Sequence, residues 1–180
     1  MKILGLDLAT STGYAYNDDQ NQFHCGSWLL ATEAELKAAR KQRLNRRLDP
    51  RVVQLFKLTQ GLHTLHCFDV IVFEDVEFSS YTLQCQLWAS FRAAIWLAPM
   101  AHKQPVFETV PVQTLKKFAT GHGGATKSMM VSALVKQDSR FSRHVDPEMA
   151  VFNGWPVNDD AVDATWLWKW AKLHLGRMKV

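Results

Sequence analysis

The chain has 180 residues, of which 47% are hydrophobic and 21% are charged, and its formal net charge is +4. This length suits one compact domain and is short for two, so we expect a single globular, soluble domain over residues 1–180. No hydrophobic run reaches the roughly 18 residues of a membrane span. The charged Lys2 and Asp7 flank only four residues, so we expect no signal peptide there.

The weak positive charge mildly favours a polyanionic partner. The three cysteines, Cys25, Cys67 and Cys85, lie far apart and lack the spacing of a metal site. An odd number of such cysteines predicts reduced thiols, and we therefore expect an intracellular, cytoplasmic protein.

Residues 3–16 predict a β-hairpin. The apolar run from Ile3 to Leu6 indicates a short buried strand that ends at the carboxylate of Asp7. A lone Asp is expensive to desolvate, so Asp7 should be paired, solvated or bound to a cation. Residues 22–30 suit a third strand that would close a meander.

Residues 32–48 begin like a helix, because Thr32 is a good N-cap residue and Glu35 follows three positions later. The segment then becomes strongly basic. This basic segment could simply be a solvated helix face or a mobile loop, or it could be a patch that contacts phosphates. The sequence leaves these two interpretations open. The spacing of apolar residues predicts a further helix over 52–65.

The apolar run at residues 69–73 predicts a second buried strand, which also ends in an acid, Glu74. A helix followed by such a strand indicates a crossover onto a parallel neighbour of the first strand. The next helix should cover residues 82–97, with Leu83 among the side chains that point inward. The remaining expectations, in chain order, are a strand at 105–110, a short helix at 112–118, a flexible loop at 120–124, a helix at 125–136, an irregular segment at 137–157 and a last helix at 161–175.

The positions of the carboxylates are the strongest feature of the sequence. Asp7 and Glu74 end two buried strands, and Asp160 and Asp163 are three residues apart on one face of a helix start. Acids at a helix N-terminus can be simple caps, and Asp159 competes with Asp160 for a place in the cluster. Four close carboxylates repel one another unless cations hold them, and such oxygen ligands select Mg²⁺ or Mn²⁺. Spacing alone leaves structural capping and a two-metal phosphodiester site equally open.

Four blocks of the sequence resemble RuvC-type Holliday junction resolvases of the RNase H-like superfamily. They follow the order of that family and span most of the chain. The blocks are Ile3 to Asp7 followed by Ser11 to Tyr14; Val72 to Val76 around Glu74; Lys116 to Lys127, which includes the Gly-His-Gly-Gly-Ala loop; and Asp160 to Ala164.

The resemblance implies a five-stranded mixed α/β sheet, an antiparallel meander followed by parallel strands, flanked by helices. It also implies a homodimer that nicks two strands of a four-way DNA junction, with Mg²⁺ as cofactor and Mn²⁺ able to substitute. The implied catalytic metal ligands are Asp7, Glu74, Asp160 and Asp163. Lys127 is implied as a further catalytic residue, and Lys116, Lys117 and Lys127 as DNA-binding residues.

The sequence also departs from the family pattern. Glu77 stands where the family often has an aromatic residue that wedges into the junction, so we expect Phe78 or Tyr81 to contact DNA instead. The basic stretch 37–47 and the segment 138–157 look unlike the bacterial members. These differences suggest a divergent branch, for example a viral one, acting at the nucleoid or in the host cytoplasm.

Three other functions remain. The turn after Asp7 resembles the phosphate-binding hairpin of actin-like ATPases, but those proteins need a second such domain and 180 residues leave no room for it. A non-catalytic DNA-binding module would not need all four acids. A nuclease with broader specificity for flaps and forks is the main alternative, because the residues that select junction shape are those that depart from the family.

Overall fold

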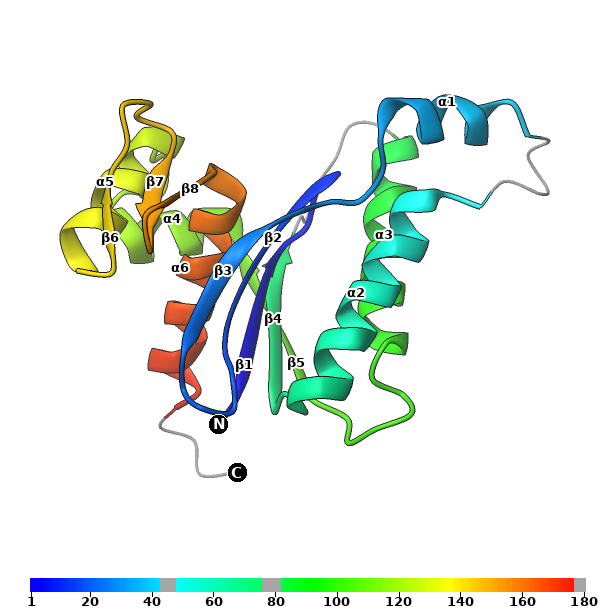
Figure 1. The fold of residues 1–180 in the computed structure, drawn as a ribbon, viewed down its shortest axis with the longest axis horizontal. Helices are drawn as coiled ribbons and strands as arrows, with labels where there is room; N and C mark the ends of the chain where they lie inside the picture. The colour runs from blue at the N-terminus through cyan, green and yellow to red at the C-terminus, as the bar shows by residue number, and fades with distance from the viewer. Residues whose placement is uncertain (43–47, 76–81, 177–180) are drawn as a thin grey trace.

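The computed structural model describes residues 1–42, 48–75 and 82–176 (Figure 1). The strands of its main sheet are β1 (Ile3–Asp7), β2 (Ser11–Asn17), β3 (Phe23–Leu29), β4 (Val70–Asp75) and β5 (Val106–Pro111). The helices are α1 (Glu33–Arg40), α2 (Pro50–His66), α3 (Thr82–Leu97), α4 (Val112–Thr120), α5 (Lys127–Gln137) and α6 (Asp159–His174). Three short strands precede α6: β6 (Phe141–Arg143), β7 (Ala150–Phe152) and β8 (Trp155–Val157).

The five-stranded sheet has the order β3-β2-β1-β4-β5. Strands β1, β2 and β3 form an antiparallel meander, whereas β4 pairs in parallel with both β1 and β5. The long connection through α1 and α2 therefore returns the chain beside its first strand, as a parallel pair requires. The predicted mixed sheet and the predicted crossover are both confirmed.

Helices cover both faces of the sheet, and alternate residues of the central strands point to opposite faces (Figure 1). Ile3 of β1 and Val72 of β4 belong to the core shared with α4, α5 and α6. Leu4 of β1 and Phe73 of β4 belong to the core shared with α2 and α3. Because both faces are covered, these two strands are apolar without a break until they reach their acids.

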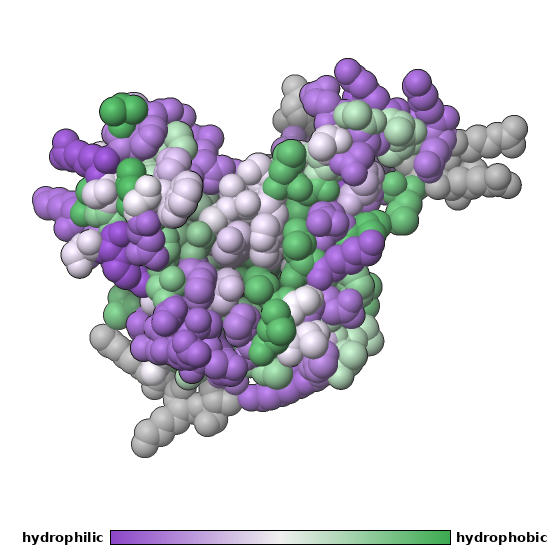
Figure 2. All heavy atoms as spheres, viewed as in Figure 1, coloured by the Kyte–Doolittle hydropathy of each residue, from purple (hydrophilic) through white to green (hydrophobic). Residues whose placement is uncertain are grey.

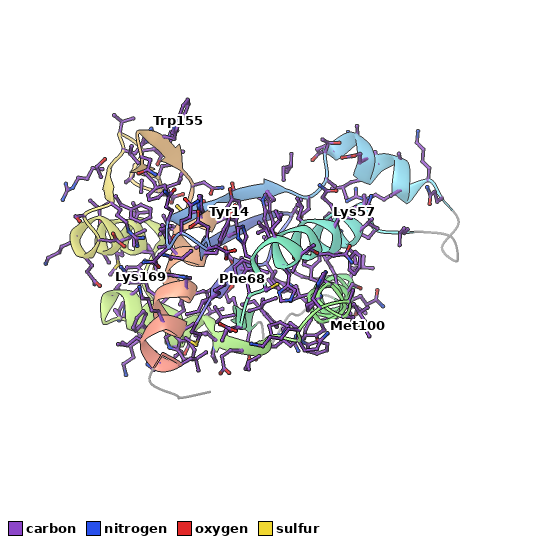
Figure 3. All side chains as sticks on the ribbon, turned by 60° about the horizontal axis from the view of Figure 1, so that its bottom comes forward. Tyr14, Lys57, Phe68, Met100, Trp155 and Lys169 are labelled. Atoms are coloured by element: carbon purple, nitrogen blue, oxygen red, sulfur yellow. The ribbon has the colours of Figure 1, made fainter. Side chains whose placement is uncertain are left out.

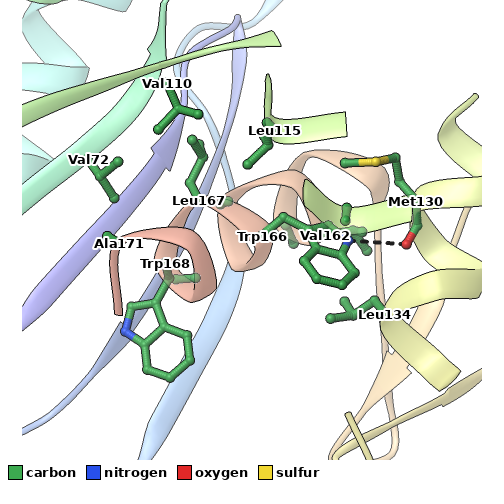
Figure 4. Packing of buried hydrophobic residues seen from close by; sticks show 14 of the residues in the cluster. Val72, Val110, Leu115, Met130, Leu134, Val162, Trp166, Leu167, Trp168 and Ala171 are labelled. Carbon is green, nitrogen blue, oxygen red and sulfur yellow. Dashed lines mark hydrogen bonds between the residues drawn. The ribbon is translucent and has the colours of Figure 1, made fainter. Parts of the chain in front are cut away.

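Helix α6 is the central helix of the first core, and most of its residues from Ala161 to Ala171 are buried. Figure 4 shows Trp166 reaching from α6 to α5, where its indole Nε1 donates a hydrogen bond to the carbonyl oxygen of Met130 (3.2 Å). The bond satisfies the one polar group of a fully buried tryptophan. This packing holds α6 rigidly against the sheet, which matters because its first turn carries acids.

The prediction of an irregular segment over 137–157 was wrong in part, because strands β6, β7 and β8 form a small antiparallel sheet there. Its core is aromatic: Phe141 and Phe152 contact Phe23 of β3. Each strand has only three residues, too few to show an alternating pattern in the sequence.

Two parts of the molecule rise beside the carboxyl ends of β1 and β4. Figure 1 shows α5 with the β6–β8 sheet on one side and α1 on the other, and Figure 2 shows the surface hollowed between them. The capping box predicted for Thr32 and Glu35 is present at the start of α1. None of the helices in the described ranges is long and apolar enough to span a membrane.

Candidate active site

Two of the predicted acids come from neighbouring parallel strands. The register pairs Leu6 with Phe73, so the next residues lie side by side: Asp7, the last residue of β1, and Glu74, the last but one of β4. Two-residue periodicity places Asp7 on the face of Ile3 and Glu74 on the face of Val72, which is the face covered by α6. Strand register alone therefore directs both carboxylates toward the helix that carries the other acids.

Two glycines let α6 approach this face closely. A Cβ atom on Gly13 would lie 1.9 Å from the carbonyl oxygen of Asp160, and one on Gly5 would lie 2.6 Å from that of Ala164. Gly13 is also the cross-strand partner of Asp7. The missing side chain at Gly13 thus brings the first turn of α6 against the strand that pairs with Asp7.

Asp160 is held in place by hydrogen bonds from two sides. The Ser11 hydroxyl donates to Asp160 Oδ2 (2.5 Å), and the side-chain amide of Asn158 donates to the same oxygen (2.9 Å). The Asn158 side-chain oxygen also caps α6 by accepting from the Ala161 amide. Both bonds and the nearby charge of Lys127 act to lower the pKa of Asp160, but desolvation outweighs them and the pKa is raised.

The pKa shifts of the acids reflect both their burial and their proximity to one another. Desolvation raises the pKa of Asp7 well above its usual range, and the charges of Asp163, Glu74 and Asp160 raise it further. The pKa of Asp163 is raised to about 7, first by desolvation and then by Glu74. Three separate parts of the chain therefore contribute carboxylates to one cluster that resists full ionisation.

Lys116 is the cation of α4 that faces this cluster. Desolvation raises the pKa of Glu74, and the charge of Lys116 opposes that shift at both Glu74 and Asp163. Lys117, the next residue, is exposed. Of the two lysines predicted to bind DNA from α4, Lys116 is thus the one whose charge acts on the carboxylates.

Lys127 begins α5 and forms an ion pair with Asp159, so it meets the anion that its helix-start position requires. The charge of Asp160 raises the pKa of Asp7 more than the charge of Asp159 does. For the pKa of Asp163 the order is reversed, and Asp159 has the larger effect. Asp159 therefore belongs to the same charged cluster, with Lys127 as its partner, and Asp160 is the one bonded to Ser11.

The two aromatic residues predicted to contact DNA, Phe78 and Tyr81, lie outside the described residues. The strand that precedes them ends at Asp75, whose side chain lies on the opposite face from Glu74 and accepts a hydrogen bond from Arg92 of α3 (2.8 Å). Of the two consecutive acids at the end of β4, only Glu74 faces α6.

The donor set fits a hard divalent cation, because every acid in the cluster offers carboxylate oxygens. Burial, together with the neighbouring carboxylates, raises the pKa of Asp7, and it raises that of Asp163 despite the nearby charge of Lys116. Within residues 1–42, 48–75 and 82–176, no group of three or more His, Cys, Asp or Glu side chains is already arranged to hold a metal ion. The acids are near one another, but the prediction of a four-ligand metal site stays a prediction.

Ser11 and Asn158 were not among the predicted site residues. Ser11 stands within the resemblance block of the opening hairpin, and Asn158 is an ordinary N-cap residue, so the only sequence signal was polarity at a turn and at a helix start. Both residues position Asp160. For Ser11 this depends on a contact with a residue 149 positions away in the chain.

We expect Ser11→Ala to lower the rate of any reaction at this site about 10- to 100-fold, as loss of a group that orients a ligand typically does. The variant should keep its thermal stability within about 1 kcal/mol, because one hydrogen bond is lost. Ser11→Thr, which keeps the hydroxyl, is the matched control. An alanine variant with full activity would show that Asp160 needs no positioning by Ser11.

No protein-family model and no curated protein matches this sequence. Solved structures do match. The chain resembles Thermus thermophilus RuvC at 12% identity, with a TM-score of 0.58 over 98% of this chain and 97% of that one. It resembles T. thermophilus RuvC in complex with Holliday junction substrate at 12% identity, with a TM-score of 0.64 over 96% of both chains. For the yeast mitochondrial Holliday junction resolvase Ydc2 the identity is 13% and the TM-score 0.51, over 92% of this chain and 75% of that one.

Proposed function

We propose that this chain, which has the fold of a divergent RuvC-type resolvase, is a metal-dependent, structure-selective DNA endonuclease that resolves four-way junctions by paired symmetric nicks. The observation that carries the proposal is the meeting of Asp7, Glu74, Asp160 and Asp163 at one edge of the sheet. Burial and the neighbouring carboxylates raise the pKa of Asp7 and Asp163, and a bound cation would offset both effects.

The four carboxylates would hold Mg²⁺, or Mn²⁺ in its place, and the bound ions would activate water and stabilise the leaving oxygen of the scissile phosphodiester. Ser11 and Asn158 orient Asp160 through their hydrogen bonds. Lys116, whose charge already reaches Glu74 and Asp163, can contact a non-bridging phosphate oxygen beside the cluster.

Lys127 is proposed to exchange its partner when DNA binds. In the free protein its ammonium group pairs with Asp159, and its side chain is more than half exposed. An exposed ion pair contributes little stability, so a phosphate can replace Asp159 at small cost. Lys127 would then oppose the charge that develops during cleavage, as the resemblance to the family implies.

A homodimer is supported by apolar side chains that are exposed at the C-terminal end of α3. Leu97 in the last turn of α3 and Met100 just after it are 52% and 65% exposed. Contrary to the sequence prediction that it points inward, Leu83 lines an open groove with Leu87 and Trp88 and is left 79% exposed. Figure 3 shows Met100 at the surface of the molecule near α3, whereas Phe68 lies between α2 and the sheet. A second copy of the chain would cover this apolar face and would supply the second active site that paired nicks need.

We expect Leu97→Glu to convert the dimer into monomers, because it places a charge in an apolar interface. Sedimentation at several concentrations measures this, and junction products should change from paired to single nicks. Leu173→Glu is a matched control, since Leu173 is 49% exposed on α6 and Leu97 is 52% exposed on α3. Equal behaviour of the two variants would contradict an α3 interface.

The direct test of the proposed function is cleavage of a synthetic four-way junction, a flap and a plain duplex with Mg²⁺, by the wild type and by Asp160→Asn. Symmetric nicks in the junction by the wild type alone are the expected result, and EDTA should abolish them. If the wild type preferred the flap, the protein would instead be a nuclease with broader specificity for branched DNA. Binding of all three DNAs without any cut would contradict a nuclease and indicate a binding module.

A further inference from the structure

The positive charge of this chain is concentrated in one short segment. Residues 33–47 contain six of the 21 Lys and Arg residues and two of the 17 Asp and Glu residues, so their formal charge of +4 equals that of the whole chain. The remaining 165 residues are therefore neutral in sum. A protein that only needed solubility would not require its excess charge to be gathered in this way.

The described part of this segment is α1, which contributes no buried residue to either core. Figure 1 shows α1 projecting from the end of the molecule where β1 and β4 finish. Its acids are used inside the helix: Glu35 completes the capping box with Thr32, and Glu33 lies 3.7 Å from Lys37. A short polar helix of this kind is held by its cap and side-chain pairs, and its packing does not explain why it is there.

Lys37 and Lys41 lie one helical turn apart, on the same side of α1. Both are exposed. The pair between Lys37 and Glu33 involves two highly exposed side chains, so it contributes little and can be given up for another anion. These two lysines can therefore meet a row of phosphates without loss of fold stability.

The surface of α1 is continuous with the turn that follows Asp7. A groove of about 660 Å³ is lined by Thr10 of that turn, by Leu36 and Arg40 of α1, and by Trp88 of α3. At its base Arg51, at the start of α2, donates to Thr10 Oγ1 (3.2 Å) and forms two hydrogen bonds with Asp49. These bonds fix the start of α2 against the turn that follows Asp7, and the Leu30 amide, just before α1, donates to the Thr10 carbonyl oxygen of the same turn (2.9 Å).

We propose that α1 is an arm that contacts the phosphate backbone of a DNA duplex arm as it leaves the cleavage site, through Lys37 and Lys41. The inference rests on the proposed function and adds to it a sequence-independent contact outside the carboxylate cluster. Such contacts fix the position of the protein on DNA and carry no base specificity. They raise affinity and leave the chemistry at the acids unchanged.

The test is junction binding in EDTA across a salt series, with the double variant Lys37→Gln/Lys41→Gln. Loss of two phosphate contacts should lower the salt slope by about 1.8 and weaken binding on the order of tenfold for each lysine at 0.1 M salt. The control is Lys136→Gln/Lys172→Gln, which removes the same charge from exposed positions on α5 and α6. Cleavage at saturating protein should equal that of the wild type.

Junctions with shortened arms sharpen the result, because the defect should disappear when the DNA no longer reaches α1. A salt slope that changes equally in both double variants would overturn the proposal. So would a changed sedimentation coefficient for the α1 variant, because α1 would then contact a second copy of the chain. A wild type that binds no branched DNA at all would contradict the proposed function, and this inference with it.

Discussion

Replacement of Asp7 by Asn is expected to abolish junction cleavage while binding stays intact or becomes tighter. The loss of rate should be at least about 10³-fold, the upper range for removal of a single electrostatic group from an active site. Binding survives because the change removes one ligand and one negative charge that faces the DNA phosphates. Single-turnover cleavage and binding in EDTA measure the two effects separately.

The same substitution should stabilise the metal-free protein by roughly 1–3 kcal/mol near neutral pH, the usual cost of a desolvated polar group without a partner. Desolvation and the charges of Asp163 and Glu74 raise the pKa of Asp7, so the folded state binds its proton more tightly than the unfolded state does. The contribution of Asp7 to the stability of the wild type in EDTA therefore falls as pH rises above about 4. The advantage of Asp7→Asn should grow over the same range, and Mg²⁺ should reduce it.

Asp69→Asn is the matched control, because its pKa is shifted in the opposite direction. The Lys103 side chain and the Lys2 backbone amide hydrogen-bond to Asp69 and lower its pKa, so its charged form stabilises the fold. Its replacement should cost up to about 1 kcal/mol, as for a partly exposed ion pair, and should spare cleavage. A metal-free Asp7→Asn protein that is also less stable than the wild type would make Asp7 a structural residue.

The second large effect is expected from Gly13→Ala, which should destabilise the protein by about 3 kcal/mol or more and remove cleavage. The new methyl group would overlap the backbone of Asp160, and backbone atoms of a packed helix cannot move aside as a flexible side chain can. The first turn of α6 would have to leave β2, and Asp160 would lose its bond to Ser11. Thermal or urea unfolding measures the stability change.

Gly61→Ala in α2 controls for the general effect of replacing a glycine. No atom lies within 4 Å of a Cβ at Gly61, and the residue is inside a helix. Alanine there should stabilise the protein by about 0.5–1 kcal/mol and leave cleavage unchanged. If Gly13→Ala behaved like Gly61→Ala, the close approach of α6 to β2 would not be what positions the site.

The sequence by itself determined the sheet and most of the cluster. The two-residue alternation of side chains along a strand puts Asp7 on the face of Ile3 and Glu74 on the face of Val72, and this rule is local and needs no structure. Because both strands are buried on both faces, only the fold shows that this is the face covered by α6. The spacing of Asp160 and Asp163 likewise places them on one side of a helix. The fold class, the crossover between the two strands and the N-cap at Thr32 followed from such short-range rules, and the structure confirms them.

Only the tertiary structure decided which groups support those acids. The contact between Ser11 and Asp160, the pair of Lys127 with Asp159 and the place of Gly13 under α6 each join segments far apart in the chain. The exposure of Leu83 was also beyond the sequence, because helical spacing predicts a face and cannot say whether another element covers it. Periodicity is set by neighbouring residues, whereas side-chain partners are set by the packing of the completed fold.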